Sequence, residues 1–130
     1  MTEKNAQISI LNQTTVMAAK QDKQENKFLY FLDDEEQNYI FVRIRIMNDG
    51  VTLESFAMMQ VSIINQKKHE ITRYDSSIRE AINVHKWYCK GNPKEFIQKP
   101  LTWETLIGFE EEIWQKWRQY LFLYKEKKGL

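Results

Sequence analysis

In the segment Tyr39–Met47, YIFVRIRIM, β-branched aliphatic residues alternate strictly with other side chains. Isoleucine or valine occupies each even position from 40 to 46, whereas the odd positions carry phenylalanine, two arginines and a methionine. Because successive side chains of a strand point to opposite faces of a sheet, this pattern predicts a half-buried strand. The tripeptide NDG at 48–50 follows, and these residues accept the positive φ angles of a hairpin turn.

Further strands are expected on either side of this hairpin. The segment after the turn is apolar at both parities, which favours a central strand or a bulge that switches faces. The expected strands are Phe28–Leu32 at an edge, Val51–Asn65, His69–Asp75 after a turn at 66–68, and Ala81–Cys89 after a loop at 76–80. The sequence GNP at 91–93 ends the last of them. Antiparallel pairing of these segments predicts a meander sheet of four or five strands.

The C-terminal segment changes to the 3.6-residue period of a helix, from about Thr102, a suitable N-cap, to Lys127. Its apolar side chains cover an arc of roughly 200°, whereas a surface helix needs little more than about 100°. One sheet face would not cover that arc, so we expect the N-terminal arm or a second protein to cover the rest. Glu110 falls inside the arc. We expect it to be a rim carboxylate rather than a buried partner for an arginine.

These patterns together predict an α+β fold, in which a long C-terminal helix packs on one face of the antiparallel sheet. The chain has 130 residues, which suits one such domain over residues 28–130. Residues 1–27 are polar, and we expect them to form a loosely held arm that orders only on contact with the body.

Composition limits the classes of function. The formal charge of +1 argues against a protein that coats nucleic acid by bulk electrostatics, but it allows a local basic patch. Cys89 is the only cysteine, so no internal disulfide forms and a cytoplasmic location is expected. The N-terminus lacks the order of a signal peptide, and the longest apolar run is too short to cross a membrane. One cysteine and two distant histidines predict no metal site, and no cofactor motif is present.

The segment His69–Lys90 collects most of the plausible acid and base groups, and we take Arg73, Tyr74, Asp75 and His85 as the candidate catalytic residues. His85 would act as general acid or base, because the ordinary pKa of histidine lies near neutrality. Arg73 would stabilise a phosphate, and Asp75 would orient the imidazole or pair with Arg73. Tyr74 would donate a proton or stack on a base.

Three more residues suggest nucleic-acid binding. Arg43 and Arg45 lie two apart on one strand and would bind phosphates, while Trp87 would stack on a base. Whether Arg73 and Asp75 share that face is left open, because Ile71 and His69 have the same parity. The arrangement would suit metal-independent RNA cleavage, but a second acid or base is missing unless Tyr74 or His69 supplies it. An ordinary surface ion pair between Arg73 and Asp75 explains the same residues without any catalysis.

The order of FVRIRIMNDG, ITRYD, VHKWYCKG and a helix rich in Trp and Tyr resembles a group of small bacterial proteins with an RYD motif. This group is similar to TumE-type toxins of toxin–antitoxin pairs, and the resemblance covers roughly Phe41 to Tyr124. It implies a small toxin-like protein that acts on or binds RNA and is held by a partner. In that group a histidine usually follows closely, as in RYDNAHG, whereas this chain has RYDSSI and keeps only His85. If the missing histidine is catalytic, this chain is inactive or only binds.

Two classes of function therefore stay open. The first is a toxin-like protein with a ribonuclease-like activity that needs no metal or cofactor. The second is a non-enzymatic interaction module, such as a phage or bacterial defence accessory protein, that uses the helix or the open sheet face. In either case we expect a protein partner, or a second copy of the chain in a homodimer, on the C-terminal helix. The candidate contacts are Trp114, Trp117 and Tyr124.

Overall fold

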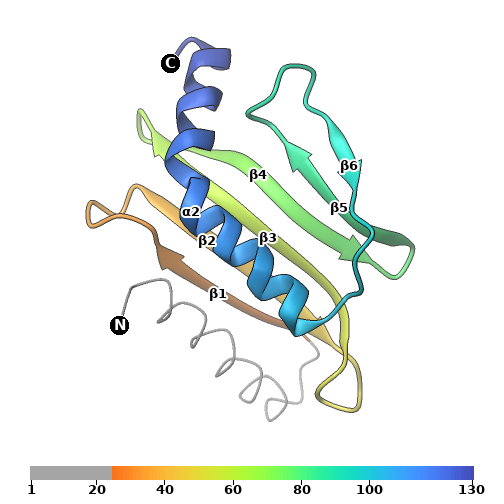
Figure 1. Cartoon of the computed structure of the whole chain (residues 1–130). Coiled ribbons are helices and arrows are strands. Elements are labelled where there is room, and N and C mark those ends of the chain that lie inside the picture. Colours follow the sequence, from red (N-terminus) through yellow and green to blue (C-terminus); the bar gives the residue numbers. More distant parts are fainter. Residues whose placement is uncertain (1–24) are drawn as a thin grey trace.

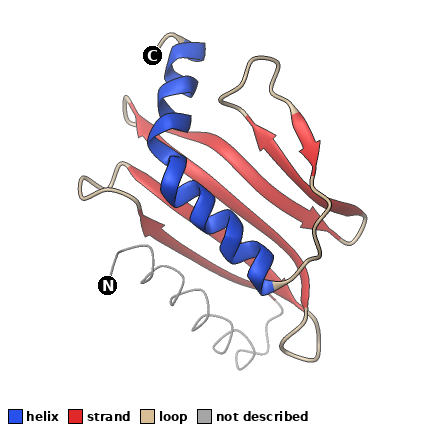
Figure 2. Ribbon diagram, in the orientation of Figure 1, coloured by secondary structure: helices blue, strands red, loops and turns tan. Residues whose placement is uncertain are grey.

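The computed structural model describes residues 25–130, which form one open antiparallel sheet and one long helix (Figure 1). The strands are β1 (Glu25–Phe31), β2 (Asn38–Ile46), β3 (Leu53–Ile64), β4 (Lys67–Ser77), β5 (Glu80–Lys86) and β6 (Lys94–Phe96), and they neighbour one another in that order. Helix α2 (Trp103–Lys128) runs diagonally across one face of the sheet (Figure 2). The α+β class, the antiparallel meander and the helix on one face are confirmed.

The sheet has six strands rather than four or five. The additional strand, β6, follows Pro93 directly, and all of its residues are exposed. Because it has only three residues, it is too short to show a period in the sequence. Strand β1 begins at Glu25, three residues earlier than the expected start of the folded body. The remainder of the predicted N-terminal arm lies outside the described residues.

Two turns are tighter than expected. Asn65 and Gln66 both have positive φ, so the β3–β4 turn takes two residues and β4 begins at Lys67 instead of His69. The predicted loop at 76–80 is also a short hairpin turn, because β4 extends to Ser77 and β5 begins at Glu80. Strand β5 ends at Lys86, before Cys89, and the chain then turns back toward β6.

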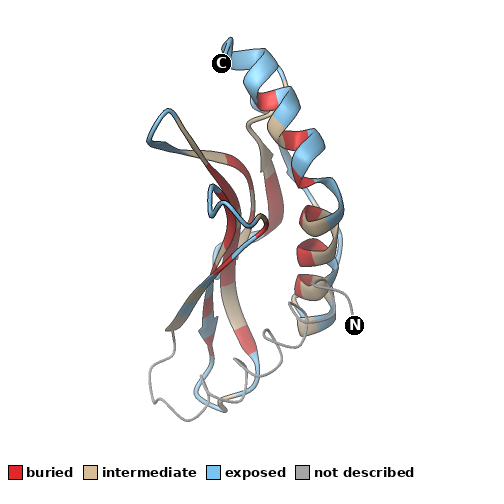
Figure 3. Ribbon diagram, turned by 90° about the vertical axis from the view of Figure 1, so that its left-hand side faces the viewer, coloured by how far each residue is buried: buried red, intermediate tan, exposed pale blue. Residues whose placement is uncertain are grey.

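The core lies between the sheet and α2, and Figure 3 shows the buried positions on the surfaces that face each other. The even positions of β2 are buried there as their alternation predicts, together with Ile82 and Val84 of β5. Helix residues that are buried include Leu106, Phe109, Ile113, Trp117, Tyr120 and Tyr124. Further apolar side chains of the helix are partly buried against this core, so the sheet covers most of the wide apolar arc. Any cover by the N-terminal arm falls outside the described residues.

The prediction that Glu110 lies at the rim of the helix–sheet contact is wrong. Glu110 is not a rim carboxylate, because only 1% of it is exposed and Tyr30 of β1 donates a hydrogen bond to its Oε2. Its partner is thus a tyrosine rather than an arginine. Burial raises the pKa of Glu110 from 4.5 to about 7, although the Tyr30 hydrogen bond acts in the opposite direction.

The ends of α2 are capped as the sequence predicts. The Thr102 hydroxyl accepts a hydrogen bond from the Thr105 backbone N–H, which satisfies one of the free donors of the first turn. At the other end Gly129 adopts the left-handed conformation, and lysines occupy the last turn. In the described part of the chain, no helix is both long and apolar enough to cross a membrane.

Candidate functional site

A β-bulge decides which residues of β4 reach the sheet face opposite α2, here called the open face. The register between β3 and β4 shifts between Gln60 and Val61, so Ile71 is an extra residue in β4. Ile71 packs against Tyr120 and Tyr124 of the helix. Beyond the bulge the parity reverses, and Arg73 pairs across the strands with His85. The bulge resolves the ambiguity of this strand and brings Arg73 and Asp75 onto the open face.

Glu70 is the centre of the polar cluster on this face. Its Oε1 accepts a hydrogen bond from Arg73 at 2.9 Å, and its Oε2 accepts one from Arg73 Nε at 3.0 Å. The indole N–H of Trp87 donates to the same Oε2 at 2.6 Å. The hydrogen bonds that Arg73 donates to Glu70 raise the pKa of Arg73, and the Asp75 carboxylate, 3.7 Å away, contributes in the same direction. The guanidinium is therefore already neutralised by carboxylates before any anion arrives.

His85 completes the cluster. Its Nε2 lies 3.7 Å from Asp75 Oδ2, which is an ion-pair distance once the ring is protonated but too long for a hydrogen bond. The imidazole stacks on the Trp87 indole with a centroid separation of 5.0 Å. The predicted group of Arg73, Asp75, His85 and Trp87 is thus gathered in space, as a ring of mutual contacts around Glu70.

Tyr74 lies on the opposite side of the sheet from these residues. It is buried, stacks on Phe109 at 4.2 Å and donates a hydrogen bond to Glu112 of the helix. Burial raises the pKa of Tyr74 above its ordinary value of 10, so its phenol stays protonated. His69 also faces the helix, where its Nδ1 lies 2.9 Å from the Tyr124 hydroxyl. Neither residue can act with His85 on a substrate bound at the open face.

Arg43 and Arg45 lie on the open face of β2 and are held loosely. Glu25 is 4.0 Å from Arg43 and 3.6 Å from Arg45, and Glu54 is 3.8 Å from Arg45. About half of each arginine side chain is exposed, at 50% and 47%. Both arginines line a hollow of about 360 Å³ together with Glu25, Ser55, Phe56, Ser76 and Ser77. Such long ion pairs contribute little stability and are readily exchanged for another anion.

The three residues predicted to contact a partner differ in exposure. Trp117 and Tyr124 are buried between helix and sheet, and Trp114 is partly buried against the core. The large exposed apolar side chains of the helix are instead Phe122, at 61%, and Leu123, at 37%. A partner contact through Trp114, Trp117 and Tyr124 stays a prediction.

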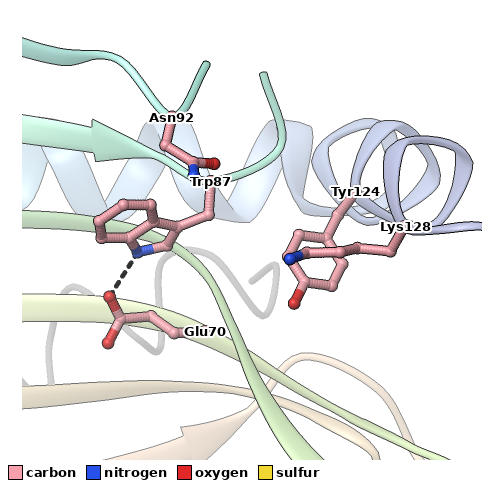
Figure 4. Close-up of a pocket in the computed structure, with 5 residues that line it drawn as sticks. All are labelled: Glu70, Trp87, Asn92, Tyr124 and Lys128. Atoms are coloured by element: carbon pink, nitrogen blue, oxygen red, sulfur yellow. Dashed lines mark hydrogen bonds between the residues drawn. The ribbon is translucent and has the colours of Figure 1, made fainter. Parts of the chain in front are cut away.

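A second hollow lies beside the polar cluster, at the end of the sheet where the helix ends (Figure 4). It has a volume of about 320 Å³ and is lined by Glu70, Trp87, Asn92, Tyr124 and Lys128. Trp87 and Tyr124 stand on opposite sides of it, with Lys128 next to Tyr124. The Lys128 ammonium lies 5.8 Å from the centroid of the Tyr124 ring.

Sequence reasoning did not single out Glu70, Asn92 or Lys128. On a regular strand Glu70 and Arg73, three residues apart, would point to opposite faces, and only the bulge brings them together. Asn92 and Lys128 line the same hollow because the last turn of α2 is bonded to the loop after β5. Lys127 Nζ donates hydrogen bonds to the Trp87 carbonyl oxygen, at 2.7 Å, and to the Asn92 side chain. A contact between residues so far apart in the chain leaves no local signal.

Comparison with known proteins adds no functional assignment, since no family model, curated protein or solved structure matches the chain. Among residues 25–130, His, Cys, Asp and Glu side chains form no group of three or more that could hold a metal ion.

Proposed function

We propose that the protein is a binding module for single-stranded RNA, with the open sheet face as the contact surface and without RNA cleavage. The observation that carries the proposal is the hollow lined by Arg43, Arg45 and three serines. Ser76 Oγ in this lining is buried and has no hydrogen-bond partner among the described residues. Guanidinium groups and hydroxyls are typical phosphate ligands, and a bound phosphate would satisfy that oxygen.

The arginines are available to such a ligand. Their ion pairs with Glu25 and Glu54 are long, and each arginine side chain is more exposed than the glutamate side chain beside it. A phosphate can therefore replace a carboxylate without the loss of a well-formed hydrogen bond. On the same face, the stacked His85 and Trp87 rings supply an aromatic platform for a base.

The same geometry argues against catalysis. Arg73 gives its hydrogen bonds to Glu70, so it offers little to a developing negative charge. The two candidates for a second acid or base, Tyr74 and His69, contact the helix. His85 alone is insufficient for the two proton transfers of RNA cleavage.

The test is fluorescence anisotropy with a labelled single-stranded RNA of mixed sequence, at several salt concentrations. The double variant Arg43→Ala/Arg45→Ala should bind more weakly for every RNA sequence. A plot of the logarithm of its binding constant against the logarithm of the salt concentration should also be less steep. The slope should decrease in magnitude by about 0.7 for each phosphate that the variant no longer neutralises. Arg118→Ala is the matched control, because this arginine lies over the Trp117 ring on the helix. Equal affinity of the double variant and the wild type would contradict the proposal.

RNA integrity on a denaturing gel tests the absence of cleavage. The wild type should leave the RNA intact during a long incubation. RNA degradation that His85→Ala or Arg73→Ala abolishes would instead establish the toxin-like ribonuclease.

A protein-interaction module is the second candidate, and the exposed apolar side chains of β1 favour it. Leu29 and Phe31 are 44% and 37% exposed and are paired across the strands with Phe41 and Tyr39 of β2. Light scattering distinguishes a homodimer from a monomer, and Leu29→Ser/Phe31→Ser should abolish the dimer. A monomer that binds RNA through Arg43 and Arg45 would leave this candidate without support.

A further inference from the structure

The hollow beside Trp87 has walls that are fixed before any ligand binds. Glu70 and His85 hold the Trp87 indole through a hydrogen bond on its N–H and a stacked ring on its face. His69 holds Tyr124, because its Nδ1 lies within hydrogen-bond distance of the Tyr124 hydroxyl. Because both aromatic rings are already ordered, a ligand loses little binding energy to the ordering of side chains.

Lysines crowd the end of the molecule that carries this hollow. The ends of β3 and β5, the starts of β4 and β6 and the C-terminal end of α2 all meet there (Figure 1). The lysines are Lys67, Lys68, Lys90, Lys125, Lys127 and Lys128. Acidic residues at 33–36 lie in the β1–β2 loop, at the same end of the sheet but near its β1 edge (Figure 1), and none of them lines the hollow. The six lysines outnumber the acidic residues Glu70 in the hollow and Glu126 in α2, and this balance favours an anionic ligand although the net charge of the chain is only +1.

Two aromatic rings and a carboxylate would also suit a quaternary or methylated ammonium group. Lys128 decides against such a ligand, since its ammonium already lies over the Tyr124 ring. A second cation in the same hollow would be repelled. A planar group that carries a negative charge can contact the rings while its charge approaches Lys128, which stands across the hollow from the Glu70 carboxylate (Figure 4).

We infer that this hollow is a nucleotide site, in which a base packs against Trp87 and the phosphate binds Lys128. The volume of about 320 Å³ lies at the lower end of the range for small-molecule pockets and suits one nucleotide. Glu70 Oε1 accepts a single hydrogen bond from Arg73, so one lone pair can accept an N–H of the base. Asn92 offers an amide group at the rim.

The ligand can be a free nucleotide or the phosphorylated end of an RNA strand. In the second case the site rests on the proposed RNA binding, because the strand would continue from the hollow onto the open face. Trp87 belongs to both surfaces, since it lines the hollow and stacks on His85.

The test is an NMR titration of the full chain, followed through the tryptophan indole N–H signals. Trp87→Phe assigns the relevant signal, because it removes one signal of the four tryptophans. AMP should shift the Trp87 signal, whereas adenosine, ribose 5-phosphate and choline should shift it far less at equal concentration. Trp87→Leu should weaken AMP binding about five- to 150-fold, which is the usual loss of one base–aromatic stack.

Lys128→Ala should weaken AMP binding about tenfold, because the phosphate loses its ammonium partner. Lys116→Ala, which removes an exposed lysine from the middle of the same helix, should leave it unchanged. Three results would overturn the site: no AMP-dependent shift of Trp87, equal shifts from ribose 5-phosphate or choline, or equal losses in the two lysine variants.

A 5′-phosphorylated adenosine pentanucleotide separates the two sources of the ligand. If it competes with AMP and depends on Arg43 and Arg45, the hollow takes the end of an RNA strand. If AMP binds but the pentanucleotide does not, the nucleotide site stands and the proposed RNA binding fails. If the pentanucleotide binds through the arginines but AMP does not bind, the RNA binding stands and the nucleotide site fails.

Discussion

Replacing Glu110 with glutamine should remove much of the pH dependence of the stability of this protein. Glu110 is 1% exposed, its Oε2 accepts the Tyr30 hydroxyl, and its Oε1 has no hydrogen-bond partner among the described residues. A carboxylate in this position loses its hydration and gains only one donor. Glutamine keeps an oxygen for Tyr30 and carries no charge at any pH.

The size and sign of the effect follow from the pKa of Glu110. Its value in the folded protein is about 7, whereas an ordinary glutamate in the unfolded chain has 4.5. Between these values the native state binds more protons than the unfolded state, so the free energy of unfolding falls as the pH rises. Each tenfold change in proton affinity corresponds to about 1.4 kcal/mol, so above pH 7 the ionisation of Glu110 lowers the free energy of unfolding by about 3 kcal/mol in total. About 2 kcal/mol of it falls between pH 5.5 and pH 8.

Urea unfolding at pH 5.5 and pH 8 measures this loss directly. Between these two pH values, the free energy of unfolding should fall by about 2 kcal/mol less in the Glu110→Gln variant than in the wild type. Glu126→Gln, at an exposed helix position, should keep the wild-type dependence. Tyr30→Phe should destabilise the protein more at pH 8 than at pH 5.5, because it removes the donor of the ionised form. If Glu110→Gln keeps the wild-type difference between the two pH values, the ionisation of Glu110 is not coupled to folding.

Three further changes test the fold. Thr102→Ala should cost about 1 kcal/mol in chemical denaturation, because the Thr105 backbone N–H loses its cap, and an unchanged midpoint would contradict the capping role. Gln66→Gly should raise the free energy of unfolding by about 1 kcal/mol, since Gln66 has a φ of 66° in the β3–β4 turn; a lower melting temperature would refute this. Phe109→Ala should cost about 3–5 kcal/mol by thermal unfolding, because Phe109 stacks on Tyr74 in the core, and a loss below about 1 kcal/mol would show that the site collapses around the smaller side chain.

Local patterns in the sequence determined the fold class and most of its elements. The alternation in β2 fixed its buried face, and the helical period with Thr102 at its start fixed α2. These features depend on neighbouring residues, whose propensity and spacing can be read without the rest of the chain. Strand β6 was not predicted, because a strand of three exposed residues shows no alternation in the sequence.

Only the tertiary structure decided what the polar residues do. The sequence placed Arg43, Arg45, His85 and Trp87 together on one face, but it could not locate the bulge at Ile71. One inserted residue reverses the parity of a strand, so Glu70 joined the site and Tyr74 was directed into the core.

The charge state of the buried groups was likewise set by distant contacts. Glu110 and Tyr30 are eighty positions apart in the chain, and Trp87 meets the end of α2 through Lys127. Burial and pairing at such separations depend on how the elements pack, because the desolvation of a carboxylate is a property of the whole core. Sequence periodicity indicates on which face of its strand or helix a residue lies. The contact partner and the pKa of that residue depend on which side chains of the opposite element pack against that face.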